Sequence, residues 1–377
     1  MKKKMRNIIC AICVLTLAAG ILSGCADRSG GTGAEGTVTV TDHDGNTVTL
    51  PADIQRIAVC DILPLPSVLT IFFDSADKIV AMAPSSMSAA ENGLLSELYP
   101  EILRADTSAI SASEVNTEEL MKLDPQVVFY NASSAQLGET LRKAGFNAVA
   151  ISVNKWGYNA VETLNQWIDL LSQIFPDADN GRSALVREYS GKSLDLVNER
   201  TAGLSDTERA RVFFLFQYSE NSIVTSGQNF FGQWWADAIG AVNASQELTE
   251  DNSVKVTMEQ VYAWNPDTVL MTNFTTAFPE DLYGNTVGSY DWSGVDAVRD
   301  RRVYKMPLGM YRSYTPGVDT PITLLWMAKT VYPELFADID ITEKTVEYYE
   351  DVFGVSLTRE QAESIFAPAG DAGKTDF

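Results

Sequence analysis

Hydrophobic and polar residues alternate with two different periods along this chain. Residues 37–41 and 47–50 alternate apolar and polar side chains on either side of an Asp-His-Asp-Gly-Asn turn. That pattern predicts a β-hairpin, in which the glycine adopts the positive φ that the turn requires. Residues 159–175 instead carry an apolar stripe at helical spacing, which resumes over residues 185–197. We therefore expect a long connecting helix within the region 158–204, and so stiff a link permits small opening motions rather than a wide hinge.

One segment of the pattern occurs twice. Residues 116–125 and 257–266 align without gaps at an offset of 141 residues. Each starts with a helix-capping residue followed three residues later by Glu or Gln, and each stops at a proline, which disfavours a helical residue before it. An apolar run of strand type follows at once, Val127–Tyr130 in the first copy and Val269–Met271 in the second. A short helix and a strand, repeated in this way, predict two similar α/β lobes.

These patterns divide the chain into an ordered series of segments. We expect an N-terminal α/β lobe over residues 37–157 and a C-terminal α/β lobe over residues 205–340, on either side of the connecting helix. A tail follows at residues 341–377, in which residues 341–367 have the pattern of two further helices.

The first 36 residues have the pattern of a targeting segment. Residues 1–24 combine a lysine-rich start with a 15-residue apolar run, which is short for a membrane span and typical of a signal peptide. They lead into Leu-Ser-Gly-Cys, which resembles the lipobox of bacterial lipoproteins, so Cys25 is expected to carry lipid and anchor the protein outside the cytoplasm. Residues 26–36 are small and polar, which predicts a flexible tether and favours a Gram-positive surface over a periplasm. A single-span anchor is the alternative.

The charge and the histidine content of the chain limit the ligands and reactions that suit it. The chain has 28 Lys and Arg against 50 Asp and Glu, and residues 1–24 hold four of the basic residues and no acidic one, so the formal charge falls from −22 to −26 without them. So acidic a protein repels nucleic acid. The only histidine, His43, lies in the hairpin turn and away from the expected cleft, which excludes histidine-rich metal sites and disfavours histidine catalysis. We expect this turn to be solvated, because its spacing matches no calcium loop. We expect Cys60 to be a core residue.

A series of motifs over residues 37–337 resembles the substrate-binding lipoproteins of ABC importers for iron–siderophore complexes, haem and cobalamin. The motifs are Thr41–Val48 with Pro51 and Arg56–Val59, Asn116–Val128, Ser226–Phe231, Ala238–Asn243, Val256–Val269, Trp292, Val295, Arg302–Tyr304, Pro307 and Leu325–Pro333. One departure is Gln126, where the family usually has Asp. The resemblance implies two Rossmann-like lobes joined by a single long helix, with the ligand in the cleft between them. It also implies a monomer that delivers its ligand to a permease dimer driven by a cytoplasmic ATPase, with no cofactor and no metal held by the protein itself.

The resemblance further implies a docking surface. In the family, one exposed glutamate on each lobe pairs with arginines of the permease, and these glutamates match Glu118 and Glu259 here. Each is the second residue of its repeated helix. The alternative is that an acidic residue in the first helical turn only complements the helix dipole.

The ligand site is expected in the loops that follow the strands of both lobes. Arg312 lies between Tyr311 and Tyr314, and its planar fork suits carboxylate or catecholate oxygen. The candidate ligand-binding residues are Arg312, Tyr311, Tyr218, Trp156, Tyr130, Asn131, Ser85, Met87, Phe230 and Phe274. A surface ion pair is the alternative for Arg312, and core packing is the alternative for each aromatic residue.

The expected function is capture of a chelated metal for import, with a ferric siderophore as the first choice. Haem, for which Tyr218 or Tyr311 could be the axial ligand, and cobalamin are the alternatives within the class. An enzyme, such as a secreted hydrolase with paired carboxylates, is a remote alternative, because Gly-x-Ser-x-Gly and His-Glu-x-x-His motifs are absent and no histidine is available for a triad. A purely adhesive or structural lipoprotein is another, and ligand-dependent closure would argue against it.

Overall fold

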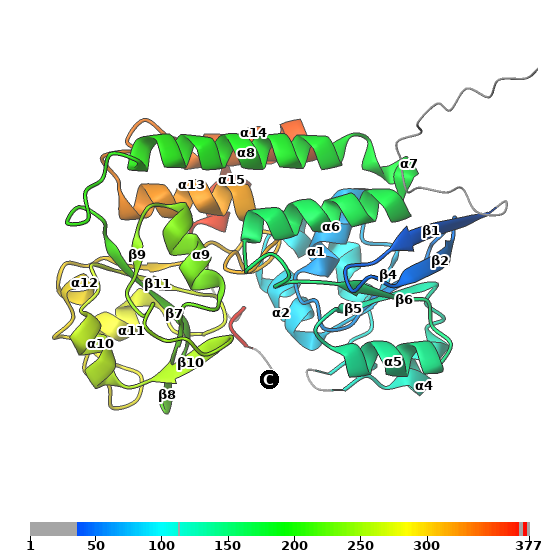
Figure 1. Cartoon of the computed structure of the whole chain (residues 1–377), viewed down its shortest axis with the longest axis horizontal. Coiled ribbons are helices and arrows are strands. Elements are labelled where there is room, and N and C mark those ends of the chain that lie inside the picture. The colour runs from blue at the N-terminus through cyan, green and yellow to red at the C-terminus, as the bar shows by residue number, and fades with distance from the viewer. Residues whose placement is uncertain (1–35, 112–113, 369–371, 375–377) are drawn as a thin grey trace, which may run out of the picture. The chain divides into compact units, whose positions relative to one another are not determined.

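A four-stranded parallel sheet organises the first half of the chain (Figure 1). In a computed structural model, which describes residues 36–111, 114–368 and 372–374, its strands run in the order β4-β3-β5-β6. We call this part the N-lobe. Its strands are β3 (Ile57–Val59), β4 (Ile79–Met82), β5 (Val127–Asn131) and β6 (Ala148–Ile151), and its helices are α1 (Leu65–Phe73), α2 (Pro84–Asn92), α3 (Leu95–Leu98), the 3₁₀ helix η1 (Pro100–Arg104), α4 (Thr117–Lys122) and α5 (Ala135–Lys143). The predicted hairpin is confirmed as β1 (Thr37–Thr41) and β2 (Thr47–Pro51), paired antiparallel.

A mixed six-stranded sheet organises the second half, which we call the C-lobe. Its order is β10-β8-β7-β11-β12, with β9 also paired to β7, and β11 runs parallel to its two neighbours, β7 and β12. The strands are β7 (Arg211–Ser219), β8 (Ser222–Ser226), β9 (Val242–Asn243), β10 (Ser253–Val256), β11 (Thr268–Met271) and β12 (Val303–Lys305). The helices are α9 (Phe231–Ala238), α10 (Met258–Trp264), α11 (Pro279–Gly284), α12 (Asp296–Arg299) and α13 (Thr320–Val331). The expected pair of α/β lobes is confirmed.

The connection between the lobes consists of three helices, α6 (Ala160–Ile174), α7 (Pro176–Asp179) and α8 (Arg182–Thr201). Pro176 ends the first helix, and positive φ angles at Asn180 and Gly181 separate α7 from α8. The 20-residue α8 is therefore the long helix that joins the lobes, and it packs along α6 and α13 (Figure 1). The largest apolar cluster contains residues of both sheets and of these helices, so the lobes share one core.

The tail contains the two further helices that the sequence predicts, α14 (Ile341–Tyr348) and α15 (Arg359–Ile365), with a π-helical turn, η2 (Tyr349–Phe353), directly after α14. Among the described residues, no helix has both the length and the apolar character needed to cross a membrane. The predicted signal peptide, the lipidated Cys25 and most of the tether at residues 26–36 lie outside the described residues and stay predictions.

The repeated segment folds alike in both lobes, as α4 followed by β5 and as α10 followed by β11. Asn116 accepts hydrogen bonds from the backbone N–H groups of Glu118 and Glu119, and Thr257 forms a full capping box with Gln260. The first copy lacks the reciprocal bond of a capping box, because the Glu119 carboxylate instead accepts a 2.6 Å hydrogen bond from Lys122. The predicted helix starts are therefore confirmed, and the second half of the capping box is found in the C-lobe only.

Candidate ligand site at the junction of the lobes

Arg312 lies fully buried where the two lobes meet. Its Nη1 donates to the Ser85 carbonyl oxygen and to the Ser85 hydroxyl, both at 3.0 Å, so it joins the C-lobe to the first turn of α2 in the N-lobe. Nη1 also donates to the Tyr311 hydroxyl at 2.9 Å. Nε and Nη2 both donate to the carbonyl oxygen of Ala372, with Nε at 2.7 Å. The guanidinium further lies over the ring of Phe274, 4.9 Å from its centroid.

The acceptors around Arg312 are all neutral. Among the described residues, no carboxylate lies within salt-bridge distance of its guanidinium. Lys305 adds a second cation on the C-lobe side, where its Nζ donates to the carbonyl oxygens of Thr275 and Ala277 at 2.6 and 2.8 Å. Burial lowers the pKa of Lys305 to about 7, and the positive charge of Arg312 contributes to that lowering. The guanidinium of Arg312 is therefore a buried positive charge in a strongly acidic protein, which suits an anion.

A buried carboxylate holds the loop that carries Arg312. Asp319 accepts hydrogen bonds from the Met310 N–H at 2.9 Å and from the Tyr349 hydroxyl at 2.5 Å. Burial raises the pKa of Asp319 to about 6. Because these bonds close the loop between residues 310 and 319 and tie it to η2, Asp319 positions Arg312 without touching it.

An aromatic wall extends from Arg312 across the C-lobe. The ring of Phe274 packs against Phe216 at 5.0 Å, and Phe216 packs against Phe230 at 5.4 Å. Tyr158, which precedes α6, reaches this wall from the other side, 5.4 Å from Phe230. Its hydroxyl donates to the Asn252 side chain at 3.2 Å. The sequence prediction misses Tyr158, although this residue directly precedes the Asn159 N-cap, a position where a large apolar residue often packs against the helix that follows.

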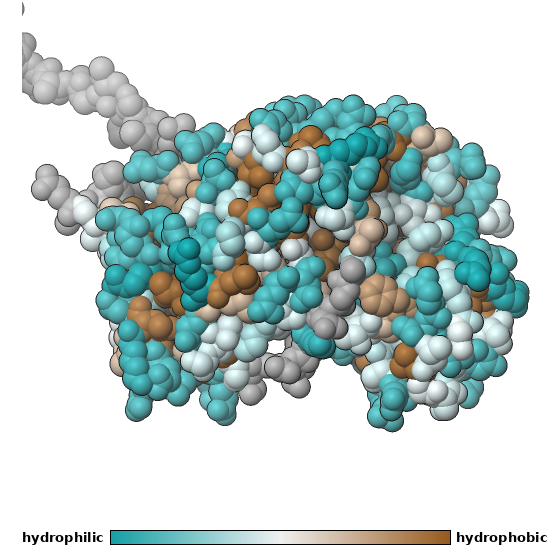
Figure 2. Space-filling model, turned by 180° about the vertical axis from the view of Figure 1, so that it is seen from behind, coloured by the Kyte–Doolittle hydropathy of each residue, from teal (hydrophilic) through white to brown (hydrophobic). Residues whose placement is uncertain are grey.

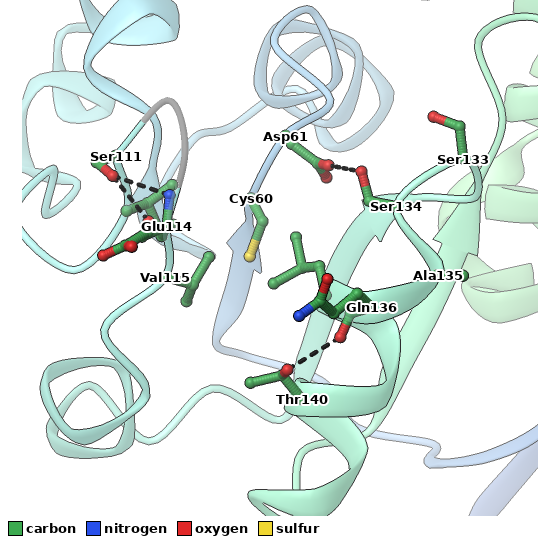
Figure 3. A pocket seen from close by; sticks show the side chains of 12 residues that line it. Cys60, Asp61, Ser111, Glu114, Val115, Ser133, Ser134, Ala135, Gln136 and Thr140 are labelled. Carbon is green, nitrogen blue, oxygen red and sulfur yellow. Dashed lines mark hydrogen bonds between the residues drawn. The ribbon is translucent and has the colours of Figure 1, made fainter.

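A polar pocket of about 740 Å³ opens at the carboxyl ends of β3 and β5, where the strand order of the N-lobe sheet reverses (Figure 3). Asp61 lines it and accepts hydrogen bonds from the Asn131 N–H at 2.6 Å and from the Ser134 hydroxyl at 2.5 Å. Cys60 points into the pocket from β3 (Figure 3), and burial strongly raises the pKa of its thiol, so it is no nucleophile at neutral pH. The remaining lining residues are Ile110, Ser111, Glu114, Val115, Ser133, Ala135, Gln136, Leu137 and Thr140.

This pocket and Ser85 lie on neighbouring loops. Asp61 follows β3, Ser85 follows β4, and the two strands are adjacent in the sheet. The Ser86 hydroxyl donates to the Leu63 carbonyl at 2.7 Å, which links these loops directly. In the space-filling view, the molecule is hollowed between the lobes on the edge away from α8 (Figure 2).

The structure brings four predicted residues together, Arg312, Tyr311, Ser85 and Phe274, and it places Phe230 in the adjoining aromatic wall. Asn131 lies at the end of β5, where its side chain accepts from Ser133. Met87 is half-buried and packs against the main core.

Three further predicted residues lie elsewhere. Tyr130 is fully buried in the N-lobe core beneath α5, where its hydroxyl accepts from Arg142 at 2.9 Å. Tyr218 is buried in the C-lobe core, where it donates to the Val287 carbonyl and accepts from Trp292. Trp156 packs edge-on against His43, with the ring centroids 5.0 Å apart. Neither tyrosine points toward Arg312, because successive residues of a strand face opposite sides of its sheet.

The hairpin turn around His43 is held by the N-lobe rather than fully solvated. Asp42 is buried, and its carboxylate accepts from the Ala150 N–H at 3.0 Å and from the Asn46 N–H at 2.8 Å. His43 Nδ1 accepts from the Ser152 N–H at 3.1 Å, and burial lowers the pKa of His43 to about 4. The expectation of a solvated turn is therefore wrong for Asp42 and His43, because both side chains dock the hairpin onto the end of β6. No group of three or more His, Cys, Asp or Glu side chains in the described part of the chain could hold a metal.

The two repeated glutamates occupy equivalent exposed positions. Glu118 is the second residue of α4, and Glu259 is the second residue of α10. Both helices lie on the edge of the fold away from α8 (Figure 1). The Glu259 carboxylate is held by its own backbone N–H and by Thr257, which lowers its pKa.

The periplasmic binding protein family model matches residues 75–308, which is more than half of the chain. The chain belongs to this family. Members bind small ligands outside the cytoplasm and work with an ABC permease and its ATPase.

Individual relatives extend the likeness over nearly the whole chain. The molybdate-binding protein MolA of Haemophilus influenzae is 23% identical over 96% of this chain and 99% of its own length. A solved periplasmic solute-binding protein of Veillonella parvula is 28% identical, covers 87% of this chain and 96% of its own, and superposes with a TM-score of 0.76. The solved haem-binding protein HmuT is 18% identical over 83% of this chain and 96% of its own, with a TM-score of 0.60. The fold of this chain is therefore that of two-lobe periplasmic binding proteins.

Proposed function

We propose that this periplasmic binding protein is a lipid-anchored carrier that captures an anionic metal chelate, first of all a ferric siderophore, and delivers it to an ABC importer. It works without catalysing a reaction and without a resident cofactor. The observation that carries the proposal is the buried guanidinium of Arg312, which lies at the junction of the lobes and has neutral acceptors only among the described residues. A buried cation without a counter-ion is costly for the fold, and a ligand oxyanion would offset that cost.

In this proposal the chelate lies between two chemically different walls. Arg312, Tyr311 and Ser85 take an anionic oxygen of the ligand, and the adjoining aromatic rings cover its apolar parts. The chelate body extends toward the pocket at β3 and β5, whose volume of about 740 Å³ falls in the range of small-molecule sites. Asp61 and Glu114 line that pocket, and its described lining includes no basic residue, so a hydroxamate or carboxylate siderophore of low net charge suits it better than a highly anionic tricatecholate.

A second candidate ligand is a tetrahedral metal oxyanion such as molybdate. The relation to MolA over 96% of this chain favours it, and so does the enclosed donor set of Arg312 with the Ser85 hydroxyl. Such a small ligand would leave most of the pocket at β3 and β5 to water. Haem and cobalamin are further candidates within the same transport class, but Tyr218 is unsuited as an axial ligand because its hydroxyl is engaged within the C-lobe core.

Calorimetric titration of the chain without its first 30 residues tests the proposal, since all described residues belong to one compact unit. The titrants are ferrichrome, ferric citrate, molybdate, haem and cobalamin. We expect one-to-one binding of a ferric chelate, weakened by loss of the Arg312 charge. Binding of molybdate alone would select the second candidate, and a folded protein that binds none of them would overturn the proposal.

A further inference from the structure

Residues 372–374 occupy the junction of the lobes and meet Arg312 there. Ala372 is 3% exposed although it belongs to no helix or strand. Its carbonyl oxygen accepts from both Nε and Nη2 of Arg312, the pair of donors that forms the fork of a guanidinium. Residues 372–374 are thus bound to the Arg312 guanidinium, the group that binds the ligand oxygen in the proposed function.

The next residue fixes the segment against the C-lobe wall. A Cβ atom added at Gly373 would overlap the carbonyl group of Thr275 and the backbone nitrogen of Thr276. The Thr275 carbonyl oxygen in turn accepts from Lys305. Gly373 therefore lies directly on the loop after β11, whose Thr275 carbonyl binds the side chain of Lys305 from β12.

The chain reaches this place by a short path. The Leu308 N–H donates to the Ile365 carbonyl at 2.9 Å, which ties the end of α15 to the loop that leads to Arg312. Six residues separate this anchor from Ala372, and residues 367–374 include no large apolar side chain. Because Ala372 has a small side chain and Gly373 has none, these two residues are held mainly by the backbone bonds to Arg312 and by the close approach of Gly373 to Thr275.

We propose that residues 372–374 are an intramolecular competitor of the ligand. In the empty protein the Ala372 carbonyl occupies the fork of Arg312, and an incoming ligand displaces it. An anionic ligand oxygen displaces the neutral carbonyl, because a hydrogen bond from the guanidinium to an anion is stronger than one to a neutral carbonyl. The competitor keeps the buried guanidinium hydrogen-bonded between ligands and makes weakly binding anions less able to occupy the site. This inference rests on the proposed function of Arg312.

Gly373→Ala tests the inference, because one added methyl group must displace the segment while leaving Arg312 intact. Gly203→Ala is the matched control, since no atom lies within 4 Å of its added Cβ. Hydrogen exchange of the peptide over residues 366–377, read by mass spectrometry, reports the contact with and without ferrichrome or molybdate. The same titrations as above give the affinity of each variant for these two probes.

We expect this peptide to be protected from exchange in the unliganded wild type and in unliganded Gly203→Ala. We expect that protection to be lost in Gly373→Ala, and also in the wild type once it is saturated with the probe that binds. We also expect Gly373→Ala to bind that probe about tenfold more tightly, as for a competitor that closes the site about 90% of the time. Unchanged affinity in Gly373→Ala, or greater protection of the peptide on binding, would overturn the competitor while leaving the proposed function in place. If neither probe nor any further titrant binds the folded protein, both proposals fail.

Discussion

Replacement of Arg312 by methionine should separate ligand binding from stability. Methionine is similar to arginine in length and volume, so the aliphatic contacts survive while the charge and five hydrogen bonds are lost. Two of these bonds form the fork, and each would be worth about 1.5–3 kcal/mol to a charged ligand oxygen. The Ala372 carbonyl already accounts for roughly 1 kcal/mol of each bond in the unliganded protein, which leaves a net loss of about 1–4 kcal/mol in the free energy of binding. We therefore expect affinity to fall by about 5-fold to 1,000-fold.

The stability of the same variant should change far less. Its former partners are neutral carbonyl and hydroxyl groups, so no unpaired charge is left behind, and removal of a buried cation relieves a desolvation cost of several kcal/mol. We expect the free energy of unfolding to change by no more than about 2 kcal/mol in either direction. Calorimetric titration gives the change in binding, and urea unfolding followed by tryptophan fluorescence gives the change in stability.

Arg302→Met is the matched control. Arg302 lies at the opposite end of the C-lobe sheet, directly before β12, and donates to the Thr268 hydroxyl and the Val331 carbonyl. Its loss should lower stability and leave binding unchanged. Binding within threefold of wild type in Arg312→Met would refute the ligand role of Arg312. Loss of binding in both arginine variants, in proportion to lost stability, would show that Arg312 is only structural.

Three further predictions address docking and pH. Reversing both charges, Glu118→Arg with Glu259→Arg, should abolish uptake in cells while leaving calorimetric binding intact, whereas Glu139→Arg with Glu188→Arg, at exposed sites elsewhere, should transport normally. His43 has a pKa lowered to about 4, so its stabilising contribution is complete above pH 6.5 and is lost as the pH falls toward 4, because the unfolded chain then takes up the proton. In urea unfolding, the free energy of unfolding of wild type should thus fall by about 2–3 kcal/mol more than that of His43→Asn when the pH is lowered from 7.5 to 4.5. An equal fall in both proteins would contradict the burial of a neutral His43 ring. Asp319 has a pKa raised to about 6, so its ionisation destabilises the fold above that pH and the penalty is relieved as the pH falls toward 3.8. From pH 4.5 to 7.5, the free energy of unfolding of wild type should fall by about 2 kcal/mol relative to that of Asp319→Asn. A difference in stability between the two proteins that does not change with pH would show that Asp319 is not buried as a charge.

The features that the sequence predicts well depend on local chemistry. Asn116 and Thr257 cap their helices, and Asp124 and Asn265, the residues before the two prolines, end these helices in left-handed conformations at equivalent positions. Such signals involve neighbours in the chain and need no knowledge of the tertiary structure. The repeat at an offset of 141 residues therefore reveals the two lobes correctly.

The site is harder to predict because it depends on the direction of side chains and on distant segments. Tyr130 and Tyr218 lie at strand ends, as expected, but each points into the core of its own lobe. The pattern after β6 singles out Trp156, whereas Tyr158, two residues on, is the residue that reaches the C-lobe. Ala372 and Gly373 carry no sequence signal, because their contacts are made by a backbone carbonyl and by a glycine, and every residue type supplies a carbonyl.

The loop from residue 310 to residue 319 contains two buried charges of opposite sign that do not pair. Asp319 is engaged by the Met310 N–H and the Tyr349 hydroxyl, which are neutral donors, and among the described residues no carboxylate reaches Arg312. An ion pair between the two would neutralise the guanidinium and remove its attraction for an anionic ligand. Because Asp319 instead fixes the loop through neutral partners, Arg312 is held in place and keeps its full charge. The same loop thus provides rigidity and a buried positive charge that no carboxylate of the described residues neutralises, and both suit a site for an anion.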